Sequence, residues 1–138
     1  MKIDFKNDLP EADQFYDLFI TTGWNEDYKL TSSELYLALQ NSYYVVCAYH
    51  KDEFVGLGRM LSDGIAHAVL FDVIVSPKFE RNGIGSKIMK NLMTKCKELK
   101  IRDIQLFCAD GKIEFYKKFG FVSRPQNAPG MEIRLRYK

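Results

Sequence analysis

The chain has 138 residues, 46% of them hydrophobic and 28% charged, and a formal net charge of +2 at pH 7. These values are typical of a globular protein and exclude wholesale disorder. The length predicts one domain over residues 1–138 with a substantial core. So small a charge gives no support for a nucleic acid or an anionic membrane as a partner.

The cysteines and the N-terminus predict the compartment. Cys47, Cys96 and Cys108 each lie in an apolar stretch, without C-x-x-C spacing. An odd, dispersed set, which we expect to be buried, is typical of a reducing cytosol rather than of a disulfide framework. Residues 1–5 show no signal-peptide core and no run reaches transmembrane length, so we expect a cytoplasmic protein.

The first part of the chain predicts a short strand followed by two helices. Residues 3–5 form the strand, and residues 8–11 resemble a capping box that opens a helix ending near Thr22. Residues 23–28 form a polar and aromatic loop. A second capping box at residues 31–34 opens the next helix.

The middle of the chain predicts a hairpin and a further strand. Residues 43–50 and 54–61 are the hairpin strands, and Gly56 and Gly58 either weaken the second strand or mark a close approach of its backbone. The next strand, at about 65–75, ends in an apolar run interrupted by one aspartate. This run is typical of a strand buried on both faces.

A glycine turn connects this strand to a long amphipathic helix. Residues 76–77, Ser-Pro, stop the strand, and Gly83 and Gly85 flank the start of an apolar stripe from Ile84 to Leu99. Such a turn leaves unpaired N–H groups at the positive end of the helix dipole, and glycine lets a phosphate approach the backbone. We therefore expect a pyrophosphate here, although the spacing matches neither a P-loop nor a dinucleotide fingerprint.

The last part of the chain completes the predicted fold. Residues 104–108 form a strand that is parallel to its predecessor because a crossover helix joins the two. Asp110 caps a short helix that ends at Gly120, and residues 131–137 alternate as a closing strand. The fold class is a mixed α/β sandwich, in which an antiparallel meander continues into a parallel strand pair with flanking helices.

Two motifs, in this order, carry a family resemblance. Residues 80–85, Glu-Arg-Asn-Gly-Ile-Gly, follow Val-Ser-Pro at 75–77 and are similar to the acetyl-CoA signature Gln/Arg-x-x-Gly-x-Gly/Ala of the GCN5-related N-acetyltransferase (GNAT) family. Residues 115–121 resemble the family's second landmark, a tyrosine in a short helix that ends in Gly-Phe. With the order of the elements, the resemblance covers nearly the whole chain and implies the GNAT-like acyl-CoA N-acyltransferase fold.

The resemblance implies acetyl-CoA as the co-substrate and gives roles to individual residues. Backbone amides of residues 81–86 hold the pyrophosphate, and residues 73–75 pair with pantetheine like an added strand. The cofactor-binding residues are thus Val73, Ile74, Val75, Arg81, Asn82, Gly83, Ile84, Gly85 and Ser86. Glu80 stands where the family has Gln or Arg, and Ala109 where many members have Asn, so these two positions depart from the pattern.

Three residues are candidates for moving protons. By resemblance, Tyr116 is the general acid that protonates the departing CoA thiolate, although its spacing alone is typical of a core aromatic residue. The general base stays open between His67, Asp72 and a chain of water molecules. Asp72 is an acid in an apolar run, and pairing with a neighbouring donor is the commoner role for such a carboxylate.

The acceptor site is predicted from the remaining segments. The family has its acceptor site beside the loop that here contains Trp24 and Tyr28. Their rings could hold an amine by cation–π contact or could serve hydrophobic packing. Arg59 either binds an anionic group of the substrate or is an exposed side chain.

We therefore hypothesise an N-acetyltransferase that moves an acetyl group from acetyl-CoA directly to a primary amine. A small-molecule acceptor is favoured because the chain is short; the alternatives are a protein or peptide acceptor and a non-catalytic acyl-CoA-binding module. No cysteine lies beside a histidine as a nucleophile, and His50 and His67 lack ligand-like spacing, so we expect no covalent intermediate and no metal. The family is compatible with a homodimer.

Overall fold

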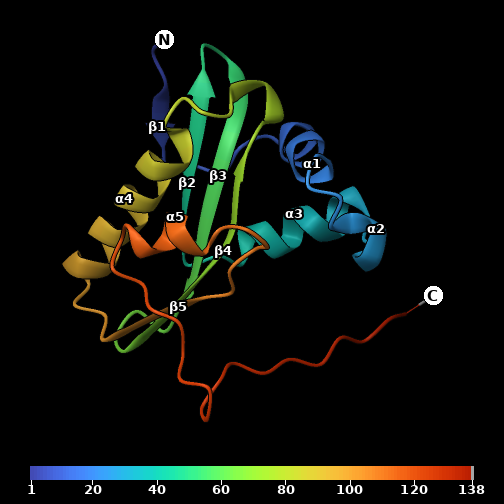
Figure 1. Ribbon diagram of the computed structural model, residues 1–138. Coiled ribbons are helices and arrows are strands. Elements are labelled where there is room, and N and C mark those ends of the chain that lie inside the picture. The colour runs from blue at the N-terminus through green and yellow to red at the C-terminus, as the bar shows by residue number, and fades with distance from the viewer. Residues whose placement is uncertain (138) are drawn as a thin grey trace. The chain divides into compact units, whose positions relative to one another are not determined.

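The computed structural model describes residues 1–137 as two compact units, of which the first is Met1–Phe107 and the second begins at Cys108. The described part of the first unit holds a five-stranded sheet in the order β1–β2–β3–β4–β5 (Figure 1). The strands are β1 (Asp4–Lys6), β2 (Tyr44–His50), β3 (Glu53–Ser62), β4 (His67–Val75) and β5 (Asp103–Leu106). Neighbours from β1 to β4 are antiparallel, whereas β4 and β5 are parallel. The predicted fold class is therefore confirmed.

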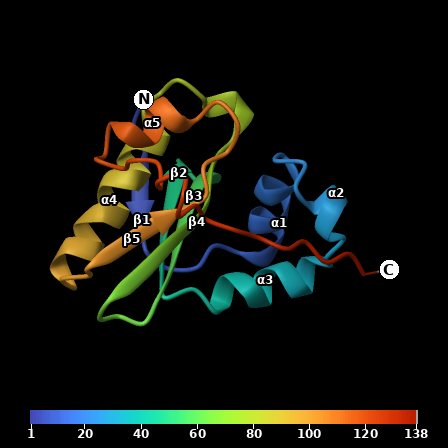
Figure 2. The same ribbon diagram turned by 60° about the horizontal axis from the view of Figure 1, so that its bottom comes forward.

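Helices cover both faces of this sheet. They are α1 (Ala12–Ile20), α2 (Asn25–Tyr28), α3 (Ser32–Gln40) and α4 (Ile84–Glu98), with a 3₁₀ turn at Pro77–Phe79. Figures 1 and 2 show α4 on one face, and α1 and α3 on the other. No helix in the described part of the chain is long and apolar enough to cross a membrane.

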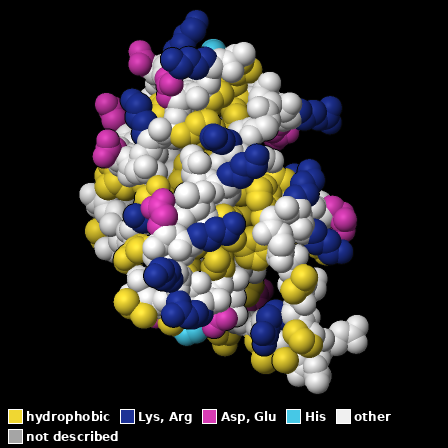
Figure 3. All heavy atoms as spheres, turned by 90° about the vertical axis from the view of Figure 1, so that its left-hand side faces the viewer, with side chains coloured by type: hydrophobic (Ala, Val, Ile, Leu, Met, Phe, Trp, Pro, Cys, Tyr) yellow, Lys and Arg dark blue, Asp and Glu magenta, His cyan; other side chains and the backbone are white. Residues whose placement is uncertain are grey.

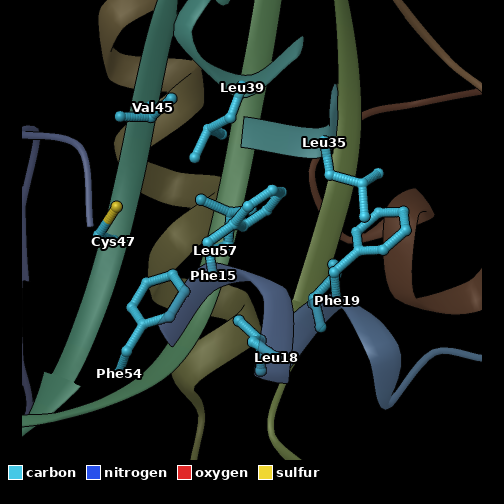
Figure 4. Close-up of a cluster of buried hydrophobic side chains, with 10 residues drawn as sticks. Phe15, Leu18, Phe19, Leu35, Leu39, Val45, Cys47, Phe54 and Leu57 are labelled. Carbon is cyan, nitrogen blue, oxygen red and sulfur yellow. The ribbon is translucent and has the colours of Figure 1, made fainter. Parts of the chain in front are cut away.

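The core on the side of α1 and α3 is one apolar cluster (Figure 4). Side chains from both helices meet those of β2, β3 and β4, and each fully buried one contributes roughly 1.5–3 kcal/mol. The cluster consists of Phe15, Leu18, Phe19, Leu35, Leu39, Val45, Cys47, Phe54, Leu57 and Ile74. It fixes the two helices that border the candidate site described below.

On the other side of the sheet, α4 approaches β3 closely because two positions of β3 lack a side chain. A Cβ at Gly58 would lie 2.5 Å from Cγ2 of Ile88 and 3.0 Å from Cδ1 of Leu92. A Cβ at Gly56 would lie 3.1 Å from Cγ2 of Ile84. The expected close approach of the backbone is therefore confirmed.

The outer side of α4 is basic, as its amphipathic sequence predicts. Lys87, Lys90 and Lys97 are exposed there. Figure 3 shows Lys and Arg side chains over the face that includes α4, with acidic side chains among them. This face is thus mixed in charge, in agreement with the small net charge.

The two predicted capping boxes have opposite outcomes. At Thr31 and Glu34 the box is present: Thr31 Oγ1 accepts from the Glu34 N–H at 3.1 Å, and Glu34 Oε1 accepts from the Thr31 N–H at 2.9 Å. The box predicted at residues 8–11 is wrong, since α1 begins at Ala12 and its N-cap Glu11 makes no side-chain cap bond. Residues 8–11 match the sequence pattern of a capping box, but the helix begins only after them.

The predicted loop at residues 23–28 contains the short helix α2, so this prediction is wrong in part. The side chain of Asn25 closes the segment by bonding the backbone of Leu30 in both directions: Oδ1 accepts from its N–H and Nδ2 donates to its carbonyl, each at 3.0 Å. A single helical turn of polar residues shows no apolar period, and periodicity could not reveal it.

In the second unit, the short helix α5 spans Ile113–Lys117. Its N-cap is Lys112, which makes no side-chain cap bond, so the cap predicted at Asp110 is wrong. Gly120 follows the helix with a φ of 94°, and its N–H donates to the Lys117 carbonyl at 3.0 Å. The helix itself ends at Lys117 with Lys118 as its C-cap, so the end predicted at Gly120 is three residues too late, and Gly120 belongs to the turn that follows.

The predicted closing strand at residues 131–137 is wrong, because the structure gives this segment no strand. Its alternating apolar side chains are 62–86% exposed. Alternation shows which face a strand could bury, but a strand forms only against a partner. Among the described residues, this segment has no such partner.

The cysteines differ in exposure. Cys47 and Cys96 are buried, but Cys108 is exposed, and the expectation that all three are buried is wrong for this residue. It lies beyond the end of β5 at Leu106. Burial, together with the charge of Asp8, raises the pKa of the Cys47 thiol to about 12, and burial also raises the pKa of Cys96.

Asp63 holds the turn between β3 and β4. Its Oδ1 accepts hydrogen bonds from the N–H groups of Ile65 (2.9 Å), Ala66 (2.8 Å) and His67 (3.1 Å). These bonds, first of all that of Ile65, favour the ionised carboxylate and lower the pKa of Asp63 from 3.8 to about 2.

We predict that Gly58→Ala lowers the free energy of unfolding by about 1–3 kcal/mol, because the added methyl group must displace Ile88. Thermal or urea unfolding measures the change. In an Ile88→Ala background the clash is relieved, and the same substitution should cost less. Equal costs in the two backgrounds would show that the close contact is not the cause.

We predict that Asp63→Asn changes how stability depends on pH. The pKa of Asp63 is lower in the folded than in the unfolded state, so the carboxylate stabilises fully above the unfolded value of 3.8 and less as pH falls toward about 2. The difference in unfolding free energy between wild type and variant should therefore be constant at neutral pH and shrink below about pH 4. Urea unfolding across this range checks it; a constant difference would contradict it.

Candidate functional site

The turn before α4 exposes a row of backbone N–H groups. Arg81 and Gly83 have left-handed φ values of 65° and 75°. The first backbone N–H that bonds back is that of Lys87, to the Gly83 carbonyl at 3.1 Å, and the described residues offer the N–H groups of 81–86 no acceptor. These donors stand at the positive end of a 15-residue helix. The arrangement suits an anion such as a pyrophosphate.

The side chains around this turn agree with that role. Asn82 braces the turn, since its Nδ2 donates to the carbonyls of Phe79 at 3.0 Å and Glu80 at 3.1 Å. Arg81 and Lys87 are exposed cations beside it. Glu80, which departs from the family signature, is exposed as well, and the row of donors consists of backbone atoms that do not depend on its side chain.

Strand β4, which precedes this turn, is irregular near its end. β3 residues Leu57 and Arg59 pair with Ile74 and Phe71, so that two residues of β4 oppose Gly58. The extra residue, Asp72, has a left-handed φ of 54°, as in a bulge. The expectation that β4 is buried on both faces is wrong, because Phe71, Val73 and Val75 are only half-buried while Ile74 is buried.

Residues 73–75 of β4 also have one free edge within the described structure. Pairing between β4 and β5 ends at Leu70 and Leu106, whereas on the β3 side Val75 still pairs with Gly56. An extended group could therefore add to β4 beyond Leu70 like a strand. The residues predicted from the resemblance to pair with pantetheine are those with this free edge.

Arg59 of β3 and Asp72 of β4 form an ion pair next to residues 73–75. Arg59 Nε donates to Asp72 Oδ2 at 2.8 Å, and the side chains are 15% and 17% exposed. Arg59 Nη1 also donates to the Ala38 carbonyl at 3.1 Å and to Ser42 Oγ at 3.0 Å. Asp72 thus pairs with a neighbouring donor, which the sequence analysis could not identify, and that donor is Arg59. Arg59 itself is not an exposed side chain.

His67 lies elsewhere on the same strand. It begins β4, six residues before Val73, and strand geometry separates the two by about 20 Å. Its side chain is 67% exposed, with Nδ1 3.4 Å from Asp103 Oδ2. The bulge at Asp72 also removes the regular alternation that would place His67 on the same side as Val73. The structure does not bring His67 to the end of β4.

A groove of about 320 Å³ runs between α1, α3 and the sheet. Its walls are mainly aromatic and aliphatic, with the Arg59–Asp72 pair as its charged part. The lining residues are Phe15, Phe19, Tyr28, Leu30, Leu35, Ala38, Leu39, Arg59, Leu61, Phe71 and Asp72. Trp24 is not among them; its ring packs edge-on against that of Phe19, with 5.9 Å between centroids. A second cavity of about 260 Å³, between β1, β2 and α4, contains none of the predicted site residues.

Tyr116 lies on α5 in the second unit, where its ring contacts those of Phe115 and Phe121, with centroids 5.0 and 6.3 Å away. Burial, with a smaller contribution from Cys108, raises the pKa of Tyr116 above its ordinary value of 10. The phenol is therefore protonated at neutral pH and available as a proton donor.

Sequence reasoning missed the pairing of Arg59 with Asp72 and the parts played by Ser42 and Phe71. One signal was available: Arg59 and Asp72 each interrupt an apolar stretch in neighbouring strands. Buried charges in neighbouring strands pair in most cases, so the two could have been matched. Nothing in the sequence indicated Ser42.

Comparison with known proteins gives three findings. Residues 9–121 match the family described as the acetyltransferase (GNAT) family. The chain is 30% identical to the uncharacterized N-acetyltransferase ycf52 of Porphyra purpurea, over 89% of this chain and 70% of that one, and 29% identical to the protein of the same name from Pyropia yezoensis, over 94% and 79%. A GNAT family acetyltransferase structure from Streptococcus pneumoniae aligns with a TM-score of 0.78 and 26% identity, over 99% of this chain and 100% of that one.

We predict that Gly83→Ala weakens the binding of coenzyme A about 10-fold or more, because a left-handed residue other than glycine costs roughly 1–3 kcal/mol. A Cβ at this position meets nothing within 4 Å, so backbone strain is the only steric effect. Asparagine adopts this conformation more readily than alanine, and Gly83→Asn should lose less affinity. Calorimetric titration measures both; wild-type affinity in the alanine variant would contradict the need for this turn.

Proposed function

Because the chain belongs to the GNAT acetyltransferase family, we propose that it transfers the acetyl group of acetyl-CoA to a primary amine of a small molecule by direct attack. Acetyl-CoA-dependent acetyl transfer is the activity of this family. The observation that carries the proposal is the row of free amides at residues 81–86 beside the open edge of residues 73–75. One site binds an anion, and the other binds an extended chain.

Acetyl-CoA fits both features, its pyrophosphate at the free amides and its pantetheine at the strand edge. The amides of 81–86 hold the pyrophosphate, with Arg81 and Lys87 adding positive charge. Residues 73–75 pair with pantetheine through their backbone. A backbone N–H of this strand can also donate to the acetyl oxygen as negative charge develops on it, which needs no side chain.

The acceptor enters from the groove of about 320 Å³ beside Asp72. A groove of this size, at the lower end of ligand pockets, supports a small molecule rather than a folded protein segment. Tyr28, which is 49% exposed, lines the groove and can contact an amine through its ring. Trp24 supports the same wall through its contact with Phe19.

The proton steps follow from the chemistry of amide formation. The amine nitrogen attacks the acetyl carbon, the carbon–sulfur bond breaks, and Tyr116 donates its phenolic proton to the departing thiolate. Its raised pKa supports this role because the phenol is fully protonated at neutral pH. The proton that the ammonium must lose before attack leaves through water, since Asp72 is engaged by Arg59 and His67 lies about 20 Å from Val73 along β4. After attack the nitrogen gives up a second proton as the amide forms, and this proton restores the Tyr116 phenol through water.

The donor is tested by calorimetric titration with acetyl-CoA, with ATP and NAD as controls. We expect selective binding of acetyl-CoA, because the strand edge adds contacts that neither nucleotide can make. Equal affinity for all three, or no binding of acetyl-CoA, would refute the proposed donor site.

We predict that Tyr116→Phe lowers kcat about 100-fold while affinity for acetyl-CoA is retained, because only the proton donor is removed. The measurement is turnover with a panel of primary amines, beside titration of the same samples with acetyl-CoA. Since the pKa of Tyr116 lies above 10, its titration should not lower the wild-type rate below about pH 10. An unchanged kcat in the variant would remove Tyr116 from the mechanism.

A further inference from the structure

We propose that Arg59 is a positioning residue for acetyl transfer: it holds Asp72 in the bulge of β4 and thereby sets the direction of the N–H groups of residues 73–75. The inference rests on the proposed function, in which a backbone N–H of this strand faces the acetyl donor. It replaces the expectation that Arg59 binds an anionic group of the substrate.

The contacts of Arg59 leave it little freedom. Nε is bound to Asp72 at 2.8 Å, and Nη1 is shared between the Ala38 carbonyl and Ser42 Oγ at 3.1 and 3.0 Å. The guanidinium therefore joins the end of α3 to the bulge in β4 through a side chain of β3. With both charged groups only 15% and 17% exposed, water screens this pair weakly.

The bulge needs such a support. Asp72 is a non-glycine residue with a φ of 54° inside a strand, and a conformation of this kind persists only where its surroundings hold it. The bulge shifts the register by one residue between the pairs Arg59–Phe71 and Leu57–Ile74. A shift of one residue turns the following side chains and N–H groups to opposite sides. Residues 73–75 therefore take their direction from Asp72.

The opposite face of the sheet prevents the bulge from relaxing. The residue across from the bulge is Gly58, and the space beside its Cα is filled by Ile88 and Leu92 of α4. Support from α4 on one face and from Arg59 on the other confines this part of β4. The wall of the acceptor groove and the donor strand are thus tied together by one side chain.

Three variants separate the ion pair from the backbone conformation. Asp72→Asn keeps an oxygen for Arg59 Nε and a residue that tolerates a left-handed φ. Asp72→Gly keeps the backbone freedom but removes the partner. Arg59→Met keeps the length of the side chain but removes its donors. We expect kcat to fall about 100-fold in Asp72→Gly and Arg59→Met, because a misplacement of reacting groups by about 1 Å can reduce the rate by this factor. In Asp72→Asn we expect kcat to fall less than about 5-fold.

Two further measurements distinguish positioning from stability. Affinity for ADP, which reaches the pyrophosphate turn but has no pantetheine, should stay within about threefold in all three variants, since the amides of 81–86 are unchanged. As a control, Cys96→Ala removes a buried group of α4 about 18 Å along the helix from Ile84. It should lower the unfolding midpoint without lowering kcat, measured well below that midpoint.

The outcomes decide as follows. Wild-type kcat in folded Arg59→Met, or equal kcat in Asp72→Gly and Asp72→Asn, would overturn the proposal. A loss of ADP affinity in Arg59→Met would do the same, because it would show that the variant also disturbs the amides of 81–86. The amide shift of Val75, three residues after position 72, gives a readout without turnover in protein labelled with ¹⁵N-valine: it should move in Arg59→Met and stay in Asp72→Asn. If the wild type acetylates no amine, the proposed function fails, and this shift still tests the positioning role.

Discussion

The contact between Gly56 and Ile84 joins the two halves of the candidate donor site. Gly56 pairs with Val75 at the end of β4, and the place of its missing side chain is taken by Ile84, the first residue of α4. The strand edge and the helix N-terminus therefore meet at one backbone position. A side chain there would push α4 outward and carry its free amides away from the strand, so the geometry of the site follows from close packing in the core.

The bulge at Asp72 is the second constraint, and it is electrostatic. A regular β4 would direct its residues by simple alternation, and a charged side chain in an apolar strand would be costly to bury. Arg59 resolves both problems: its charge neutralises Asp72, and its Nη1 donates to the Ala38 carbonyl of α3 and to Ser42 Oγ. A local irregularity of the strand is thus part of the architecture rather than a defect.

The sequence predicted well those elements whose signals are local. The apolar stripe from Ile84, the capping box of Thr31 and Glu34, and the parallel strand after a crossover helix all depend on neighbours in the chain, and all are present. The free amides of 81–86 followed from the glycine turn for the same reason. Resemblance to a family added the order of the elements.

The failures concern contacts between distant residues. Alternation at 131–137 matched a strand, but no strand forms there because pairing needs a partner that alternation does not provide. His67 and Asp72 shared a strand in the sequence pattern, yet the length of β4 and its bulge give them separate surroundings. The partner of Asp72 lies 13 residues away on another strand, beyond any periodic pattern.

The different exposure of the cysteines has a practical consequence for chemistry on this protein. Thiolate is the reactive form of cysteine, and the raised pKa values of buried Cys47 and Cys96 keep both thiols protonated and shielded at neutral pH. Cys108 is exposed and lies in the same unit as Tyr116. A maleimide-linked fluorophore would therefore attach at this one position of the native protein, without mutagenesis, and would report on the surroundings of Cys108.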